Sequence, residues 1–186
     1  MSDRQPTTTR GTSDHDATSP AAKIHRRATA PAALPRRSAE LTAAERLVVG
    51  ALRHWIVGLG DNSGRHWSHA WNDLARELGS GPARDAVAGL TRLVATLGGH
   101  ARGRIRHHLP CCPCLTADEV RLLGFIAACQ AAAPAAARAQ AEWLVRADGV
   151  GDLLAAGLAL GQALGQRGQR LPVRAVRRPG AVGRCL

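Results

Sequence analysis

The reactive side chains of this chain are concentrated between His100 and Glu119. This stretch holds three of the eight histidines, three of the five cysteines and three arginines. Thiolates and neutral imidazoles are the ligands that zinc prefers, so these residue types favour zinc as a cofactor. The candidate metal ligands are Cys111, Cys112, Cys114, His107 and His108.

The surroundings of these cysteines favour the thiolate form. Cys114 lies two positions before Thr116, which we expect to begin a helix, and amide groups at a helix N-terminus stabilise negative charge. No acidic residue occurs between Asp85 and Asp118. A thiolate is both the metal-binding and the nucleophilic form of cysteine, so soft-metal ligation and redox chemistry are both candidate activities.

The spacing of the cysteines leaves three alternatives open. The pair Cys112 and Cys114 is closer than the usual pair of zinc ligands, whereas Cys111 and Cys114 form a C-x-x-C motif. The loop could therefore be a tight turn with small buried cysteines, a metal site, or a thiol redox site. A redox C-x-x-C motif usually lies beside a strand in an α/β unit, and this sequence shows no such alternation. Further ligands for a metal would come from His100, Cys129, His66 or His69.

The elements that must position this loop are predicted to be helices. Capping boxes at Thr42 and Thr116, each with Glu three residues later, predict two helix starts. Apolar residues at helical spacing predict helices over about 42–59, 65–78, 82–97, 116–133, 135–147 and 152–164. Pro82 is expected as the first residue of its helix and Asp152 as an N-cap. We therefore predict an all-α fold, with five or six helices in a compact bundle-like domain.

The predicted core is made mostly of small and aliphatic side chains. Aromatic residues make up only 3% of the chain, and we expect all four tryptophans, Trp143 among them, to face inward. In the last predicted helix Gly157, Gly161 and Gly165 fall four residues apart. This spacing predicts a close approach of another helix, within the bundle in preference to a homodimer through the same face.

The positive charge lies mainly outside the predicted domain. The formal charge of +11 divides into +3 for residues 1–40 (7 basic, 4 acidic), +2 for 41–166 (12 and 10) and +6 for 167–186 (6 and 0). The segments 1–40 and 167–186 are rich in Pro, Ser, Thr, Gly and Arg, and we expect both to be disordered. Basic tails attract phosphates without sequence preference. Nucleic-acid binding through these tails and through Arg102, Arg104 and Arg106 is therefore an alternative function.

Composition also bears on the compartment. The N-terminus lacks the apolar core of a signal peptide, and no apolar run reaches the roughly 20 residues that span a bilayer. An odd number of cysteines, three of them within four positions, is unlike a secreted disulfide framework. We expect a cytoplasmic protein without a membrane segment.

The block from Pro110 to Glu119 resembles a known but uncharacterised family. Small alphaproteobacterial helical proteins of this family carry a Pro-Cys-Cys cluster followed by Thr-x-Asp-Glu, which matches Pro110-Cys111-Cys112 and Thr116-Ala117-Asp118-Glu119. The resemblance covers about residues 41–166, with this block as its specific part. It implies a helical bacterial cytoplasmic protein and no particular activity.

The sequence favours a small non-enzymatic accessory or regulatory protein. The Cys/His loop at 100–116 would bind zinc or sense redox state, and a protein partner would read the result. No nucleophile elbow, phosphate-binding loop, dinucleotide fingerprint or zinc-protease motif occurs in the chain. Nucleic-acid binding is the first alternative, and a thiol oxidoreductase using Cys111 and Cys114 is the second.

Overall fold

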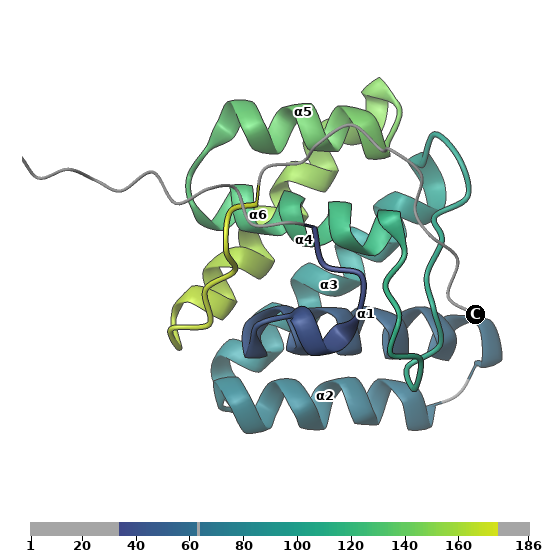
Figure 1. Ribbon diagram of the computed structural model, residues 1–186, viewed down its shortest axis with the longest axis vertical. Coiled ribbons are helices and arrows are strands. Elements are labelled where there is room, and N and C mark those ends of the chain that lie inside the picture. Colours follow the sequence, from purple (N-terminus) through teal and green to yellow (C-terminus); the bar gives the residue numbers. More distant parts are fainter. Residues whose placement is uncertain (1–33, 63, 175–186) are drawn as a thin grey trace, which may run out of the picture. The chain divides into compact units, whose positions relative to one another are not determined.

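The computed structural model describes residues 34–62 and 64–174, and within them the protein is all-α, as predicted (Figure 1). Two short 3-10 helices and two isolated β-bridges complete the regular structure of this part of the chain. No helix among these residues is both long and apolar enough to cross a bilayer. The elements are η1 (Ser38–Glu40), α1 (Ala43–Asp61), α2 (Gly64–Leu78), α3 (Ser80–His100), α4 (Ala117–Gln130), α5 (Pro134–Leu144), η2 (Ala147–Gly149) and α6 (Val150–Gly165).

Both predicted capping boxes are present and begin α1 and α4. The Glu45 backbone N–H donates to Thr42 Oγ1 at 3.2 Å, and the Thr42 N–H donates to Glu45 Oε2 at 2.8 Å. Thr116 and Glu119 repeat this arrangement at 3.1 and 2.8 Å. Each box satisfies amide groups that a helix start leaves without partners, which is why these two helix starts were readable from sequence.

Two other helix starts differ from the prediction. α3 begins at Ser80, so Pro82 is its third residue and not its first. α6 begins at Val150, which places Asp152 in its first turn and not at its N-cap. Proline is tolerated anywhere in the first turn because those amides have no partner within the helix.

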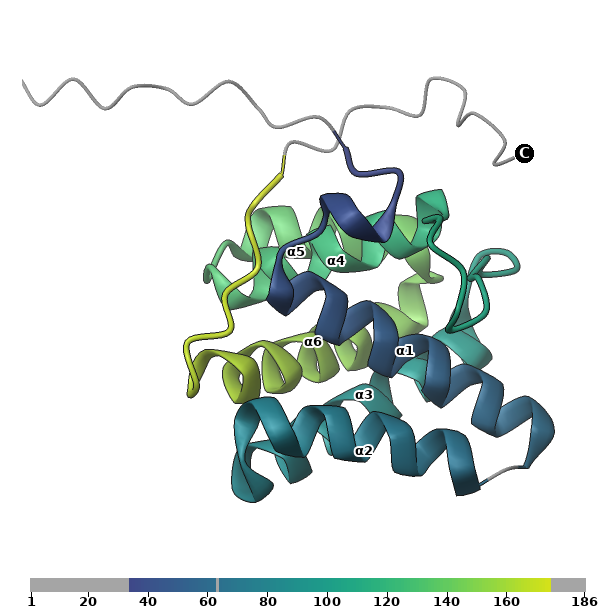
Figure 2. The same cartoon turned by 60° about the horizontal axis from the view of Figure 1, so that its bottom comes forward.

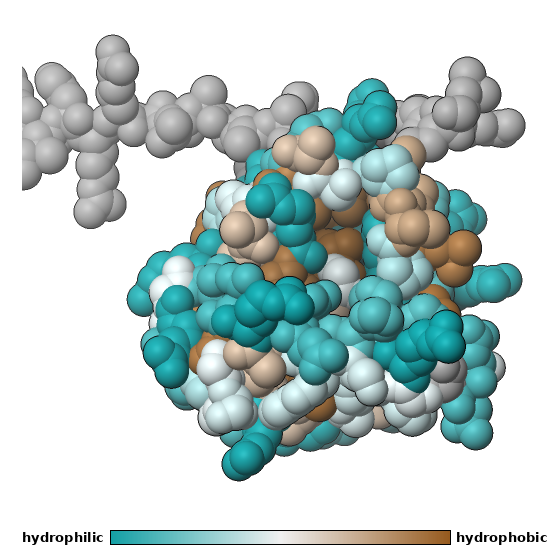
Figure 3. All heavy atoms as spheres, turned by 90° about the horizontal axis from the view of Figure 1, so that it is seen from below, coloured by the Kyte–Doolittle hydropathy of each residue, from teal (hydrophilic) through white to brown (hydrophobic). Residues whose placement is uncertain are grey.

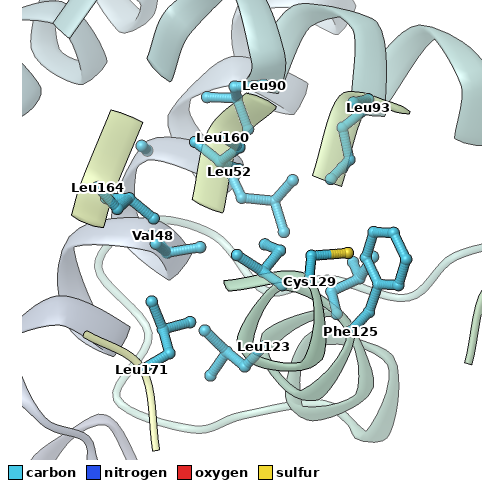
Figure 4. Packing of buried hydrophobic residues seen from close by; sticks show 14 of the residues in the cluster. Val48, Leu52, Leu90, Leu93, Leu123, Phe125, Cys129, Leu160, Leu164 and Leu171 are labelled. Carbon is cyan, nitrogen blue, oxygen red and sulfur yellow. The ribbon is translucent and has the colours of Figure 1, made fainter. Parts of the chain in front are cut away.

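The core lies where α6 packs against α3 on one side and against α4 and α5 on the other, an arrangement visible in Figure 2. Figure 4 shows that α1, α3, α4 and α6 all contribute buried side chains to it. Phe125 of α4 is fully buried, and most of the other buried apolar residues of the described chain are leucines and alanines. Burial of this apolar surface is the main favourable contribution to folding.

The glycine face of α6 packs inside the domain. A Cβ added at Gly157 would lie 2.5 Å from the Phe125 ring, and one at Gly161 would lie 3.3 Å from the Gln130 backbone nitrogen. α4 therefore covers the face carrying Gly157, Gly161 and Gly165, which confirms the packing within the bundle. The alternative of a homodimer through this face is not supported, because the face is already occupied.

α2 covers α1 with a half-exposed interface. The rings of Trp55 on α1 and Trp67 on α2 lie 6.1 Å apart, and Trp67 sits so close to Gly58 that a Cβ there would clash. Only Ala70, Leu74 and Leu78 of α2 are fully buried. The molecular face on the α2 side is largely hydrophilic (Figure 3), in keeping with a helix that packs along one narrow stripe.

The ordered domain is longer at both ends than the predicted boundaries at 41 and 166. Arg174 Nε lies 2.8 Å from Glu45 Oε1, and the Leu171 N–H donates to Gln130 Oε1 at 2.8 Å. Near the other end, the Ser38 N–H donates to the Pro113 carbonyl at 2.7 Å. The predicted disorder of 1–33 and 175–186 concerns residues outside the described part.

Candidate functional site

The Cys/His loop joins α3 to α4, and its residues 101–116 form no helix of their own, whereas His100 is the last residue of α3. Irregular segments of about this length are uncommon within small domains and usually carry function. Figure 1 shows the loop as a long excursion beside the bundle that returns to the start of α4. Its conformation must be fixed from outside, because it lacks the internal ladder of a helix.

A buried ion pair lies at the base of the loop. Arg53 of α1 places its Nε 2.6 Å from Glu119 Oε1 and one terminal nitrogen 3.0 Å from Glu119 Oε2. The two side chains are 3% and 0% exposed. A two-point contact between a guanidinium and a carboxylate is among the strongest hydrogen-bonded pairs in proteins.

Arg53 uses its remaining donors on the loop backbone. Its terminal nitrogens donate to the carbonyls of Cys112 and Cys114 at 2.6 Å each, and to that of Leu109 at 3.4 Å. Together with the two bonds to Glu119, these contacts engage all five N–H groups of the guanidinium. One buried side chain therefore fixes three carbonyls of the cysteine-bearing part of the loop.

Glu119 is equally engaged. In addition to Arg53, it accepts from the backbone N–H of Thr116 at 2.8 Å and from that of His108 at 3.2 Å. Burial alone would raise the pKa of Glu119, but the hydrogen bonds from Arg53, Thr116 and His108 outweigh burial and lower its pKa. The carboxylate is therefore ionised and serves a structural purpose at the start of α4.

The N-terminal segment fixes the other side of the loop. Arg37 and Cys114 form an isolated antiparallel bridge, and the Leu115 N–H donates to the Arg36 carbonyl at 2.9 Å. This contact was not predicted, because residues 34–40 were assigned to a disordered tail. Short extended pairing of this kind depends on a partner that is distant in sequence, which local composition does not reveal.

The predicted cysteine ligands have different environments. Cys111 is exposed, Cys112 is half-buried, and both are free thiols. Cys114 is buried and disulfide-bonded. Because Cys111 is free, the C-x-x-C pair of Cys111 and Cys114 is not joined. Cys129 lies in the core, where burial raises the pKa of its thiol to about 11.

His107 and His108 are half-buried within the loop. The His107 Nδ1 lies 3.3 Å from the His108 carbonyl oxygen, and the His108 backbone N–H bonds to Glu119. Among the described residues, no three His, Cys, Asp or Glu side chains are arranged so that they could hold a metal ion. The zinc site therefore stays a prediction, without support from this arrangement.

The predicted nucleic-acid-binding arginines are exposed on the first part of the loop. Arg102 Nε donates to the carbonyls of Glu142 and Val145 at 2.6 and 2.9 Å, so Arg102 also satisfies the C-terminal end of α5. Arg146, which follows α5, forms the reciprocal contact: its guanidinium donates to the Gly99 and Ala101 carbonyls at the end of α3.

A cluster of three histidines, which was not predicted from the sequence, lies between α1 and α2. His54 Nδ1 and His66 Nδ1 are 3.0 Å apart, and the His54 ring stacks on His69 with centroids 5.2 Å apart. Burial lowers the pKa of His54, and the neighbouring His66 and His69 lower it further. His66 and His69 share a helical spacing, but the position of His54 opposite them depends on how the two helices pair.

No family model matches the chain, and no curated protein or solved structure shows significant similarity to it.

Proposed function

We propose that the protein is a small non-enzymatic accessory or regulatory protein, and that the Cys/His loop is the surface that a protein partner recognises. One observation carries this proposal: the buried pair of Arg53 and Glu119 hydrogen-bonds to the backbone of an irregular loop and thereby fixes its conformation. A preformed loop loses little conformational entropy on binding, which favours recognition. The same engagement leaves neither side chain available for acid–base catalysis.

The outer face of the loop offers an apolar side chain beside free thiols. Leu109 is 61% exposed, Cys111 is exposed, and Cys112 is half-buried. Oxidation of Cys111 by a peroxide would make this face polar and thereby regulate binding. In that step the thiolate attacks one peroxide oxygen, the O–O bond breaks, and the departing hydroxide takes up a proton to form water, leaving a sulfenic acid.

A cytoplasmic location is part of the proposal. Three of the four cysteines in the described part of the chain, Cys111, Cys112 and Cys129, are free thiols, as is typical of a reducing compartment, whereas the disulfide at Cys114 is the feature that opposes this location. The oxidoreductase alternative is less favoured, because Cys111 and Cys114 do not form a disulfide with each other.

Hydrogen–deuterium exchange tests whether the loop is preformed. We expect the amides of His108, Leu115 and Thr116 to exchange slowly, because each donates to a defined acceptor. The variant Arg53→Met should release this protection, whereas Arg138→Ala, which removes an exposed ion pair, should not. Exchange of these amides at the rate of an unstructured peptide in the wild-type protein would overturn the proposal.

Two further measurements concern the thiols. Elemental mass spectrometry of untagged protein, beside a Cys111→Ser, Cys112→Ser variant, decides between a metal-loaded loop and a free one.

Capture of a partner from an extract of the source cells should depend on Cys111 and Leu109, resist high salt and change after peroxide treatment. Capture unaffected by Leu109→Ala and Cys111→Ser would place the recognition surface elsewhere.

A further inference from the structure

A second surface, independent of the Cys/His loop's outer face, lies around Trp143. This residue was expected in the core, but it is 57% exposed near the end of α5. The inward face of α5 is made by Ala137, Ala141 and Leu144, which recur at helical spacing and leave no inward position for Trp143. A large aromatic side chain therefore lies on the surface.

The exposed indole is held in place by a cation. The Arg121 guanidinium carbon lies 3.4 Å from the centroid of the Trp143 ring, which is a cation–π contact. Arg121 is itself only 8% exposed and pairs with Asp118 at 3.5 Å. The ring is thus supported on one side by a fixed side chain while more than half of its surface meets solvent.

The arginine-rich part of the loop is anchored beside this ring. Arg102 bonds to the carbonyls of Glu142 and Val145, which flank Trp143 in the chain. The Arg106 N–H donates to Asp118 at 2.9 Å, and Asp118 in turn pairs with Arg121 under the indole. The arginines were predicted from the sequence as a nucleic-acid-binding group. The aromatic residue beside them was not predicted, because the fold alone brings it there.

The acidic groups of this surface are already paired. Glu142 lies 2.8 Å from Arg138, and Asp118 is shared between Arg121 and the loop backbone. Arg104 and Arg106 have exposed side chains with no such carboxylate partner among the described contacts. The surface therefore combines unneutralised positive charge with an open, rigid aromatic face.

We infer that this surface binds single-stranded nucleic acid, with one base stacked on Trp143 and the neighbouring phosphates contacted by Arg104 and Arg106. Stacking on an aromatic side chain beside a basic track is how proteins bind single strands without sequence preference. Bases in a duplex are stacked inside and unavailable to an indole. The positive charge of +6 over residues 167–186 adds attraction to phosphates for every variant alike.

Fluorescence anisotropy with the full-length protein and a labelled 20-nucleotide oligothymidine tests this inference. Trp143→Ala should weaken binding by roughly 10-fold or more, whereas Trp143→Phe should retain most of the affinity because it keeps a stacking face. Leu158→Ala, which removes an exposed apolar side chain from α6, is the matched control and should change nothing. Binding of the oligothymidine that is unchanged in Trp143→Ala, or no binding at low salt, would overturn the inference.

Salt dependence separates phosphate contacts from general attraction. Arg104→Ser with Arg106→Ser should lower the slope of log affinity against log salt by about 1, since each single-strand phosphate contact contributes about 0.7. Arg84→Ser with Arg92→Ser removes the same charge from the exposed side of α3 and should lower the slope less. Equal binding of a duplex of the same length would identify a general polyanion surface and contradict the inference. Tighter binding of polyglutamate, with an affinity unchanged in Trp143→Ala, would identify a surface for acidic proteins and also contradict it.

Discussion

Arg53 and Glu119 are 66 residues apart in the chain, yet their side chains meet at 2.6 Å in the buried base of the Cys/His loop. Arg53 joins three elements, because it belongs to α1 and its guanidinium contacts both the start of α4 and the loop carbonyls. Glu119 thus has two structural roles: it completes the capping box of α4 with Thr116, and it binds Arg53, which anchors the candidate site. The stability of the fold and the shape of the loop are coupled through this pair.

Removing one member of the pair should cost much of the stability of the domain. Glu119→Gln leaves the Arg53 charge buried without a counter-charge, and we expect a loss of about 3–5 kcal/mol. Arg138→Ala, which breaks the exposed pair with Glu142, should cost less than about 0.5 kcal/mol. Urea unfolding at pH 7 measures both, and similar losses in the two variants would contradict the structural importance of burial.

Acid should unfold the protein partly through the same carboxylate. Hydrogen bonding outweighs burial and lowers the pKa of Glu119 in the folded state. Between the folded and unfolded pKa values, the unfolded state therefore binds more protons than the folded state. The stabilisation is present above about pH 4.3, the pKa of an unfolded Glu, and is lost as pH falls through the lower folded value. Urea unfolding between pH 6 and 3 should show this loss, and Glu119→Gln should show a smaller one.

Two helical glycines should respond oppositely to alanine. A Cβ at Gly89 of α3 would lie 2.9 Å from the Leu160 backbone nitrogen of α6, so Gly89→Ala forces the helices apart and should cost about 1–3 kcal/mol. Gly50 of α1 has no atom within 4 Å of the added Cβ, so Gly50→Ala should gain roughly 0.5–1 kcal/mol from helix propensity. Thermal unfolding of the two variants measures the difference. A loss of stability in both would show that Gly50 packs more tightly than its open surroundings indicate.

The turn after α4 contains an alanine in a conformation that favours glycine. Ala132 has φ of 51° and an exposed side chain, so Ala132→Gly relieves backbone strain without loss of packing. We expect a gain of roughly 0.5–1 kcal/mol after the larger unfolded-state entropy of glycine is counted. Ala131→Gly, at φ of −79°, is the neighbouring control and should lower stability. The prediction fails if chemical denaturation shows the same sign for both variants.

Much of the fold was predictable because its signals are local. Thr42 and Thr116 begin helices through contacts with residues three positions away, and these starts were placed correctly. Trp143 was misplaced because α5 is built from alanines, and its weak apolar stripe made the large aromatic residue look like the core anchor. Helical periodicity identifies a face reliably only when the inward residues are also the large ones.

The candidate site was predicted only as a stretch of sequence. The cysteines and arginines of the loop could be recognised by type, but Arg53 is a buried residue of α1 and gives no local sign that it reaches Glu119. The neighbourhood of Trp143 and Arg121 likewise depends on how α4 and α5 pair. Long-range contacts follow from the packing of helices, which local patterns do not determine.

The histidine cluster between α1 and α2 should make the domain sensitive to mild acid. His54 and His66 share one hydrogen bond between two Nδ1 atoms 3.0 Å apart, which requires at least one of the two rings to be neutral. Burial and the nearby His66 and His69 lower the pKa of His54, and Asp73 opposes the shift. The unfolded state therefore binds more protons below about pH 6.5, so stability is full above that pH and falls as the pH decreases.

Tryptophan fluorescence should report this transition, because Trp55 and Trp67 pack against each other across the same interface. Chemical unfolding at pH 7.5 and pH 5.5 should show lower stability at the acidic value. His54→Gln should reduce the difference, since a neutral side chain no longer gains a proton on unfolding. His107→Gln, which alters a histidine of the Cys/His loop instead, should leave it unchanged. An equal pH dependence in the wild-type protein and His54→Gln would contradict this assignment, since Glu45 and Glu119, whose pKa values are lowered, lose their stabilisation only at lower pH.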